Sequence, residues 1–476
     1  MSQNKTRILF QDTSDHHVAY CDSNLGSAAV VQCTAQMLRK FISEVEIASL
    51  IQLSPDFAAR NSIRVVPAKI FSSRSFSLGE STRAGTAFLT AKLWSLICKY
   101  LQLNIDYLVK RGLLKEYYDA DIIIDLSMDH LNDNFGIIPV LEHTRDILLA
   151  WIFNKPVVIY AQSIGPYNGR FAVRIARMGL DKATLITVRE GISREWLEKI
   201  GVHRPPIRVT ADPAFLLESA KPKRIDELLS AFKIDNSNPV IGIAVLEGIL
   251  LRTKGWSGNK RFIWSAYQFL RYLLPEKLFL SIMKLAGNSK YFLNLRSSTR
   301  DNAIAAFAKV ADYLSIQLNA TILLLPHVIM PEETAEDRRD ARNTANEVYE
   351  IVSNKEKILP FSNRYTAEDI KGIIGRCDMV ISAKMHAAIA ATSQCIPTLV
   401  IGAHPKFKGI MRTLDMEEWV CERFSTESII EQAQKLWQQR KQVKARLNNK
   451  IKSIKEQALL NGKLASELVN LTQKTT

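Results

Sequence analysis

The sequence predicts an α/β protein with two doubly wound domains that face each other across a cleft. Apolar runs of strand length alternate with amphipathic segments of helix length through most of the 476 residues. The strand-like runs are apolar throughout, as expected for parallel strands that helices cover on both faces. This alternation stops over residues 218–239 and then restarts, and the chain is long enough to bury two or three cores.

The first domain is predicted to cover residues 1–220. A helix is predicted over residues 193–201, because Ser193 can cap its first turn and Gly201 follows Lys199 at its end. The strand candidates of this domain lie at residues 7–10, 44–50, 120–126, 156–161, 183–188 and 207–210.

The second domain is predicted to cover residues 236–415. The boundary before it, "ESAKPKRIDELLSAFKIDNSNP", is polar, has prolines near both ends and contains no strand candidate. A basic, helix-prone segment follows the domain over residues 416–476. The strand candidates of this half are 240–246, 320–327, 357–361, 378–382 and 397–402, and its helices are predicted at 300–318, 335–353 and 366–376.

Two basic, aromatic-rich insertions interrupt the alternation, a helical one at about 68–118 and another at about 249–298. In the second, aromatic side chains are interleaved with lysines and arginines over residues 254–283. This pattern predicts an interfacial helix on a membrane, and a helical hairpin packed on its own domain is an equal alternative. Nucleic-acid binding is disfavoured, because no recognised binding module accompanies the segment.

Charge and cysteine content narrow the class of protein. Lys and Arg outnumber Asp and Glu by 63 to 48, and the net charge of +15 predicts an acidic partner such as a phosphorylated substrate or an anionic membrane surface. The cysteines are scattered without a C-x-x-C pair, so neither a zinc site nor a disulfide framework is expected. No signal peptide or membrane-spanning run is evident, which predicts a cytoplasmic protein, at most attached to the inner face of the cell membrane.

The segment "MVISAKMHAAIAATSQCIPTLVIGAHPKFK", residues 379–408, contains the strongest site candidates. Lys384 and His386 follow the strand that ends at Ser382 and stand at the start of a helix. Unpaired N–H groups of a first helical turn, together with a lysine, favour a bound anion, and a histidine there can exchange a proton near neutral pH. The alternative is a solvated lysine beside a histidine that caps the core.

Other candidates follow the remaining strands, where ligands of α/β sheets bind. Arg189 can hold a carboxylate or phosphate with two hydrogen bonds, or form a surface ion pair with Glu190. Asp212 can accept a proton or bind a sugar hydroxyl, or cap a turn. A carboxylate within "SMDHLNDNFG", residues 127–136, can act as general base on a hydroxyl. Further polar candidates are Asn24, Asp129, Asp133, Ser163 and His327.

Several common site types are absent from the sequence. There is no Walker loop, no G-x-S-x-G or H-E-x-x-H motif and no cluster of metal ligands, so we expect neither a metal nor a cofactor. Two sheets that both end in polar and basic residues predict a transferase with an anionic donor.

Seven blocks, in this order, resemble the polysaccharide pyruvyl transferase family: "NLGSAA", "DADIIIDLSMDHLNDNFG", "AQSIGPY", "VREGISREWLEKIG", "ADPAF", "LLLPHV" and "ISAKMHAAIAATSQCIPTLVIGAHPK". They span most of residues 23–408, and the last block is the most specific. The resemblance implies two Rossmann-like domains similar to those of B-type glycosyltransferases. It also implies transfer of a pyruvyl group from phosphoenolpyruvate to a saccharide, with release of phosphate and usually formation of a cyclic ketal.

The resemblance assigns roles to these candidates. It implies that Arg189 and Lys384 hold the phosphate and carboxylate of phosphoenolpyruvate, with Ser382, Ser163 and His327 in the same donor site. It implies that His386 donates a proton. Asp129 is our candidate to orient or deprotonate the acceptor hydroxyl, and Asn24, Asp133 and Asp212 are candidates for acceptor binding. The chain departs from the family pattern at Lys384, commonly an arginine, and at Met128, often a glycine.

Two other functions stay open from the sequence: a nucleotide-sugar-dependent glycosyltransferase, and an inactive family member that acts as a scaffold. The expected partners are phosphoenolpyruvate, a saccharide acceptor that includes lipid-linked forms, and an anionic membrane surface, but no nucleic acid. A homo-oligomer is left open.

Overall fold

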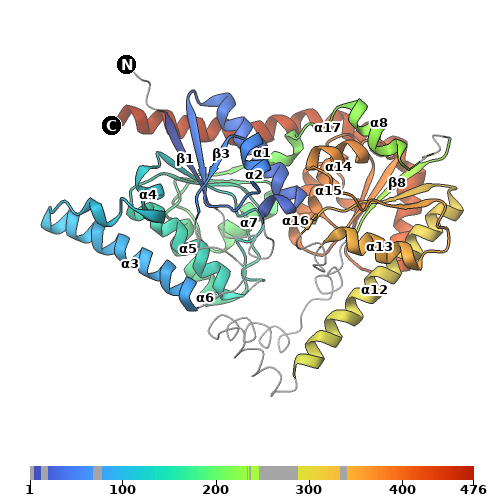
Figure 1. Cartoon of the computed structure of the whole chain (residues 1–476), viewed down its shortest axis with the longest axis horizontal. Coiled ribbons are helices and arrows are strands. Elements are labelled where there is room, and N and C mark those ends of the chain that lie inside the picture. The colour runs from blue at the N-terminus through green and yellow to red at the C-terminus, as the bar shows by residue number, and fades with distance from the viewer. Residues whose placement is uncertain are drawn as a thin grey trace.

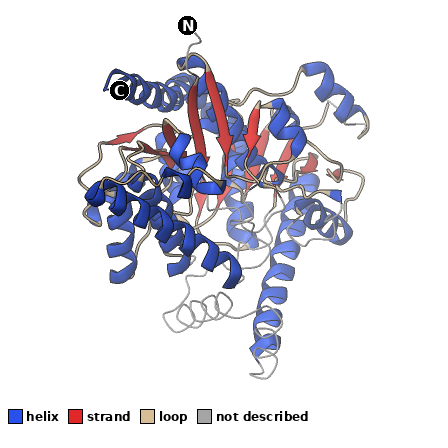
Figure 2. Ribbon diagram, turned by 60° about the vertical axis from the view of Figure 1, so that its left-hand side comes forward, coloured by secondary structure: helices blue, strands red, loops and turns tan. Residues whose placement is uncertain are grey.

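The computed structural model describes residues 5–11, 20–67, 78–134, 136–232, 234, 237–245, 288–332 and 340–475. It contains two parallel β-sheets, each enclosed by helices, which confirms the predicted fold class (Figure 1, Figure 2). The break between the sheets falls between Val209 and Val240, and the predicted boundary at 218–239 lies within it.

The first sheet has the strand order β3-β2-β1-β4-β5-β6-β7. This is the Rossmann order, in which the direction of winding reverses between β1 and β4 and ligands bind beyond the carboxyl ends of the strands. Its strands are β1 (Thr6–Gln11), β2 (Val45–Ser49), β3 (Ile63–Val65), β4 (Ile122–Asp125), β5 (Val157–Gln162), β6 (Leu185–Val188) and β7 (Ile207–Val209).

The second sheet repeats the same winding, with the order β10-β9-β8-β11-β12-β13 and its reversal between β8 and β11. Its strands are β8 (Val240–Ala244), β9 (Thr321–Leu324), β10 (Ile358–Pro360), β11 (Met379–Ser382), β12 (Thr398–Ile401) and β13 (Val420–Cys421).

Helices connect the strands and cover the sheets. In the first half they are α1 (Leu25–Phe41), α2 (Pro55–Arg60), α3 (Leu78–Leu101), α4 (Gly112–Asp119), α5 (Ile137–Ile152), α6 (Arg170–Leu180), α7 (Gly191–Lys199) and the 3-10 helix η3 (Pro213–Leu216). The second half contains α8 (Pro222–Ser230), α12 (Asn288–Gln317), α13 (Ala341–Ile351), α14 (Ala367–Ile374), α15 (Met385–Thr392), α16 (Pro405–Thr413) and α17 (Thr426–Thr475).

The edge strands and the start of one helix differ from the sequence predictions, whereas the end of that helix agrees with them. The short edge strands β3 and β13 were not predicted, because two or three residues are too few to show a pattern. The helix predicted over 193–201 begins earlier, and Glu190, not Ser193, caps it: the Glu190 carboxylate accepts a hydrogen bond from the Ser193 backbone N–H. Gly201 has φ +79° just beyond the helix, as a C-terminal glycine does.

Side chains from the two faces of the first sheet enter different cores. Leu9 and Ile123 pack with α4, α5 and α6. Ile8 and Ile124 point the other way, because successive strand side chains alternate between faces. This second core continues through α1 into the second domain without a break.

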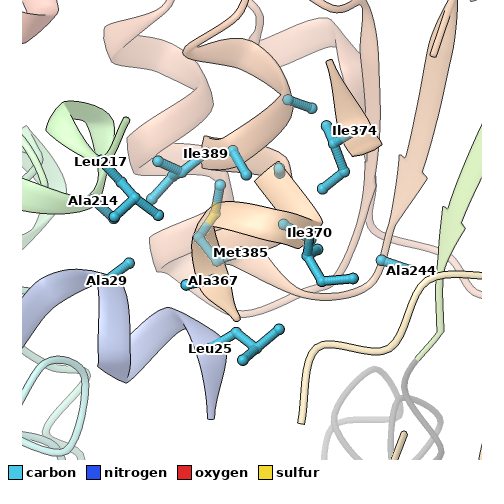
Figure 3. Packing of buried hydrophobic residues seen from close by; sticks show 14 of the residues in the cluster. Leu25, Ala29, Ala214, Leu217, Ala244, Ala367, Ile370, Ile374, Met385 and Ile389 are labelled. Atoms are coloured by element: carbon cyan, nitrogen blue, oxygen red, sulfur yellow. The ribbon is translucent and has the colours of Figure 1, made fainter. Parts of the chain in front are cut away.

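Apolar packing fixes the two domains against each other. Met385 of α15 lies among Leu25 and Ala29 of α1 and Leu217 after η3, so residues far apart in the sequence share one core (Figure 3). Burial of one large apolar side chain stabilises such a junction by about 1.5–3 kcal/mol.

Helix α17 reinforces this junction, because it runs along both domains (Figure 1). Near its start, Gln434 contacts the Tyr313 hydroxyl of the second domain. Further along, the buried Asn461 accepts a hydrogen bond from Thr210 Oγ1 at 2.8 Å and donates one to the Ala211 carbonyl at 2.9 Å. The C-terminal helix therefore supports the chain just before Asp212.

The first insertion forms α3 and α4, whereas the second, with its predicted membrane helix at 254–283, lies outside the described residues up to the start of α12. Within the described ranges, no helix is both long enough and apolar enough to cross a membrane. The same ranges contain no group of three acidic, histidine or cysteine side chains placed to hold a metal ion.

Candidate functional site at the domain junction

The turn between β11 and α15 positions Lys384 and His386. Ser382 Oγ accepts a hydrogen bond from the Lys384 N–H at 3.1 Å and donates one to the Lys384 carbonyl at 2.7 Å. Lys384 is the N-cap residue of α15, and its side chain caps no backbone N–H of the helix. Ser382 therefore shapes the turn, while Lys384 brings a cation to the start of a helix, where anions are favoured.

His386 contacts the first domain through a glycine. A Cβ atom added at Gly26, in the first turn of α1, would lie 2.2 Å from His386 Nδ1. Because no real side chain can approach so closely, glycine is required at position 26 for the imidazole to hold its place. The blocks "NLGSAA" and "ISAKMHAA" thus meet at one point.

Asp212 joins Arg189 to His386. Arg189 donates from Nη1 to Asp212 Oδ2 at 2.6 Å and from Nε to Ser163 Oγ at 2.7 Å. His386 Nε2 lies 3.6 Å from the same Asp212 oxygen. The other oxygen, Oδ1, accepts a hydrogen bond from the Ala214 N–H at 2.9 Å.

These contacts keep Asp212 ionised. Burial alone would raise the pKa of this carboxyl, but Arg189 and His386 lower it below its usual range. An ionised carboxylate beside an imidazole holds the ring in orientation and stabilises the imidazolium. The Arg189 side chain is only 1% exposed and already hydrogen-bonded, which favours a positioning role over direct donor binding.

His327 has no hydrogen-bond partner at either ring nitrogen among the residues that the structure describes. It is buried, and its backbone carbonyl accepts a hydrogen bond from the Leu25 N–H at the start of α1. Burial, followed by the nearby charges of His386 and Lys384, lowers the pKa of His327 well below its usual value, so the ring is neutral. A buried polar group without a partner costs about 1–3 kcal/mol.

Asp129 forms a second link between the domains, with an ion pair to Lys406 of α16. Burial would raise the pKa of Asp129, but Lys406, His130 and Arg189 hold it well below the usual range. The Asp129 side chain is 20% exposed, unlike that of Asp212. Such a carboxylate is a weak base at neutral pH, and it is better suited to orient a hydroxyl than to deprotonate it.

The backbone conformation at Met128 explains why glycine is favoured at this position. Its φ angle is +56°, the left-handed region in which side chains are disfavoured. Its sulfur accepts a hydrogen bond from Ser27 Oγ of α1 at 3.4 Å, so the side chain packs at the domain junction.

The acceptor-binding candidates Asn24 and Asp133 both accept hydrogen bonds from backbone N–H groups of the first domain. Asn24 caps α1 and accepts a hydrogen bond from the Gly26 N–H at 3.2 Å. Asp133 accepts hydrogen bonds from the Asn168 N–H at 2.6 Å and the Gly169 N–H at 2.8 Å, and so anchors the loop before α6. Their roles in acceptor binding stay predictions.

The structure thus brings together His386, Asp212, Arg189 and Ser163, with Lys384 and His327 close by. Sequence reasoning missed Lys406, although it belongs to the last family block, and it missed Asn461 as a support of the site. The signal for Asn461 is an asparagine that follows the apolar residues 458–460 within a helical pattern.

A separate cavity of about 750 Å³ lies between α1, α14 and α17. Lys371 lines it, and burial lowers the pKa of this lysine to about 8. None of the predicted site residues lines this cavity, so it is distinct from the candidate site.

The architecture defines a class of protein. HepE of Anabaena, solved with UDP and glucose, aligns with a TM-score of 0.53 and 10% identity over 98% of this chain and all of that one. UDP-GlcNAc 2-epimerase of Neisseria meningitidis aligns with a TM-score of 0.52 and 11% identity over 99% of this chain and 100% of that one. At this identity the likeness shows the fold alone: two parallel-sheet α/β domains similar to B-type glycosyltransferases and epimerases.

The sequence comparison identifies a family, which is more specific than the likeness in fold. The sequence profile described as polysaccharide pyruvyl transferase matches residues 24–405, and the chain belongs to this family. The amylovoran biosynthesis protein AmsJ of Erwinia amylovora is 21% identical over 305 residues, which cover 64% of this chain and 61% of that protein.

Proposed function

We propose that the protein transfers a pyruvyl group from phosphoenolpyruvate to two hydroxyls of a saccharide. The observation that carries this proposal is His386 Nε2 3.6 Å from buried Asp212, at the carboxyl ends of strands from both sheets. Beside it lies a neutral His327, whose ring has no hydrogen-bond partner among the described residues. Family membership and the exopolysaccharide relative support a saccharide acceptor.

The donor binds at the start of α15. Lys384 and the first N–H groups of the helix attract the carboxylate and phosphate of phosphoenolpyruvate. His327 supplies one hydrogen-bond donor and one acceptor from its neutral ring. Arg189 acts indirectly, because it holds the Asp212 carboxylate that orients His386.

His386 then protonates the methylene carbon of phosphoenolpyruvate. The neighbouring carbon becomes electrophilic, and the first acceptor oxygen bonds to it. The second acceptor oxygen displaces phosphate, and the electron pair of the broken C–O bond leaves on the phosphate. Of the two hydroxyl protons released, one restores the proton that His386 gave and the other leaves with phosphate.

Asp129 and Lys406 orient the acceptor at the same junction. The ionised, partly exposed Asp129 can accept a hydrogen bond from an attacking hydroxyl. Lys406 belongs to the second domain, so the pair sets the distance between donor and acceptor sites.

The experiment supplies the full chain with phosphoenolpyruvate and a panel of saccharides with neighbouring hydroxyl pairs. We expect phosphate release only with an acceptor, together with a pyruvyl ketal detected by mass spectrometry. Consumption of UDP-sugars instead would favour a glycosyltransferase, and absence of phosphoenolpyruvate binding would favour a scaffold. Either result overturns the proposal.

A further inference from the structure

Helix α3 presents an apolar face to solvent. Leu89, Leu93, Leu96 and Tyr100 follow one another at spacings of three and four residues, which places them on one side of the helix. Leu89 is 68% exposed, Leu93 54% and Tyr100 70%. In Figure 1, α3 lies along the outer edge of the first domain, away from α17.

The opposite side of α3 is already packed. Ala91 is buried, and Phe88 and Trp94 pack against the core formed with α4, α5 and α6. An ordinary surface helix has one apolar stripe and one polar face, and this helix has two apolar faces. Within the part of the chain that the structure describes, nothing accounts for this exposed outer face.

Positive charges flank the outer face. Lys92, Lys99 and Lys110 are exposed in and after α3, as is Arg111, whereas Asp106 is the sole acidic residue between positions 85 and 112. The Asp106 carboxylate is engaged by Trp94 Nε1, the Tyr118 hydroxyl and Lys110.

The basic residues beside the outer face of α3 continue next to α5, where the exposed Trp151 lies between two lysines. Lys182 Nζ lies 4.2 Å and Lys92 Nζ 5.9 Å from the ring centroid of Trp151. Leucines and a tyrosine framed by lysines and a tryptophan are the composition of helices that lie in a membrane interface.

We propose that the outer face of α3 docks the protein on an anionic lipid bilayer. The leucines and Tyr100 enter the boundary between head groups and acyl chains, and the flanking lysines contact lipid phosphates. The charge favours a bilayer over a second copy of this chain, because two such faces would bring lysines against lysines. This proposal concerns α3 and not the segment 254–283 of the sequence prediction, and it does not depend on the proposed chemistry.

The test is co-sedimentation of the full chain with phosphatidylcholine vesicles, with and without phosphatidylglycerol. We expect the wild type to sediment with the anionic vesicles and to be released by salt. The double variant Leu93→Gln, Tyr100→Gln should partition about tenfold less. The matched control, Ile316→Gln with Ile351→Gln, replaces equally exposed apolar residues on the second domain and should bind as the wild type does.

Two results would overturn the proposal. Equal vesicle binding by the wild type and the α3 variant would place the membrane contact elsewhere on the chain. A wild type that ignores vesicles, but forms a dimer that the α3 variant dissociates in sedimentation velocity, would make this face a self-association surface. Circular dichroism of each variant confirms that it is folded.

Discussion

Asp212 and Asp129 both follow strands of the first sheet, yet their surroundings differ. The Asp212 side chain is fully buried between Arg189 of its own domain and His386 of the other. Asp129 is partly exposed and pairs with Lys406 of the second domain. Both carboxylates are kept ionised against the effect of burial, which their cationic partners outweigh.

The different exposure of Asp212 and Asp129 suits the two carboxylates to different tasks. A sealed carboxylate holds an imidazole in one orientation, while a partly exposed one can exchange its lysine for a substrate hydroxyl. We therefore infer that Asp212 prepares the proton donor and that Asp129 meets the acceptor.

The largest effect is expected for His386→Ala. Loss of a positioned proton donor lowers the rate by about 10²–10⁴-fold. The measurement is acceptor-dependent phosphate release, and His203→Ala, which removes an exposed histidine of the first domain, is the control. Similar rates for the two variants would exclude His386 as the proton donor.

The two aspartates should differ in stability when each is neutralised. Asp212→Asn leaves Arg189 as a buried, uncompensated charge, so we expect a loss of about 3–5 kcal/mol in the free energy of unfolding. Asp129→Asn removes a carboxylate from Lys406, whose side chain is 11% exposed against 1% for Arg189, so the expected loss is smaller, about 1–3 kcal/mol. Urea unfolding measures both, and equal losses would contradict the distinction between a sealed and an exposed carboxylate.

Asp125 ends β4 just before Asp129. Its contribution to stability should fall as the pH rises, whereas the contribution of Asp129 should fall as the pH drops. Burial raises the pKa of Asp125 from 3.8 to about 6, although hydrogen bonds from Ser127 and Gln11 oppose the rise. The folded state then holds a proton that the unfolded state releases. The stability from this carboxyl is complete below pH 3.8 and is lost as the pH rises through about 6.

The expected change from this carboxyl is about 3 kcal/mol. The stability difference between the wild type and Asp125→Asn should therefore fall between pH 4 and pH 7. For Asp129 the pKa is lowered, so the corresponding difference should instead decline on acidification below the unfolded value. Unfolding titrations at several pH values compare the two, and parallel slopes would show that one assignment is incorrect.

Gly26→Ala should have a smaller effect on stability than Asp212→Asn. The new methyl group would displace His386, at a cost of about 1–3 kcal/mol typical of overpacking. Gly85→Ala is the control, because a Cβ there has no neighbour within 4 Å. A Gly26 variant with full stability and full phosphate release would show that the contact with His386 is not required.

Much of the fold follows from the sequence, because long apolar runs such as 120–126 and 156–161 form central strands that depend little on context. The family blocks likewise contain His386, Arg189 and Asp212, and their roles in catalysis stay predictions. What the sequence could not show is the pairing between distant segments. Asp212 looks the same in the sequence whether it binds a sugar or an arginine, and only the fold places Arg189 within 2.6 Å of it.

Other misses have the same cause. Lys406 is one lysine of several near its helix, and its contact with Asp129 spans the two domains. The exposed face of α3 was also hidden, because leucines at helical spacing predict a buried stripe as readily as a docking surface.

The central claim is that His327, whose ring has no hydrogen-bond partner within the described ranges, binds phosphoenolpyruvate. Calorimetric titration of phosphoenolpyruvate into the wild type and His327→Leu, with the melting temperature of each protein, tests it directly. We predict that the leucine raises the melting temperature, because a buried polar ring without partners is removed, and weakens phosphoenolpyruvate binding about tenfold or more. Unchanged affinity in the variant, or no heat from the wild type, would contradict the account.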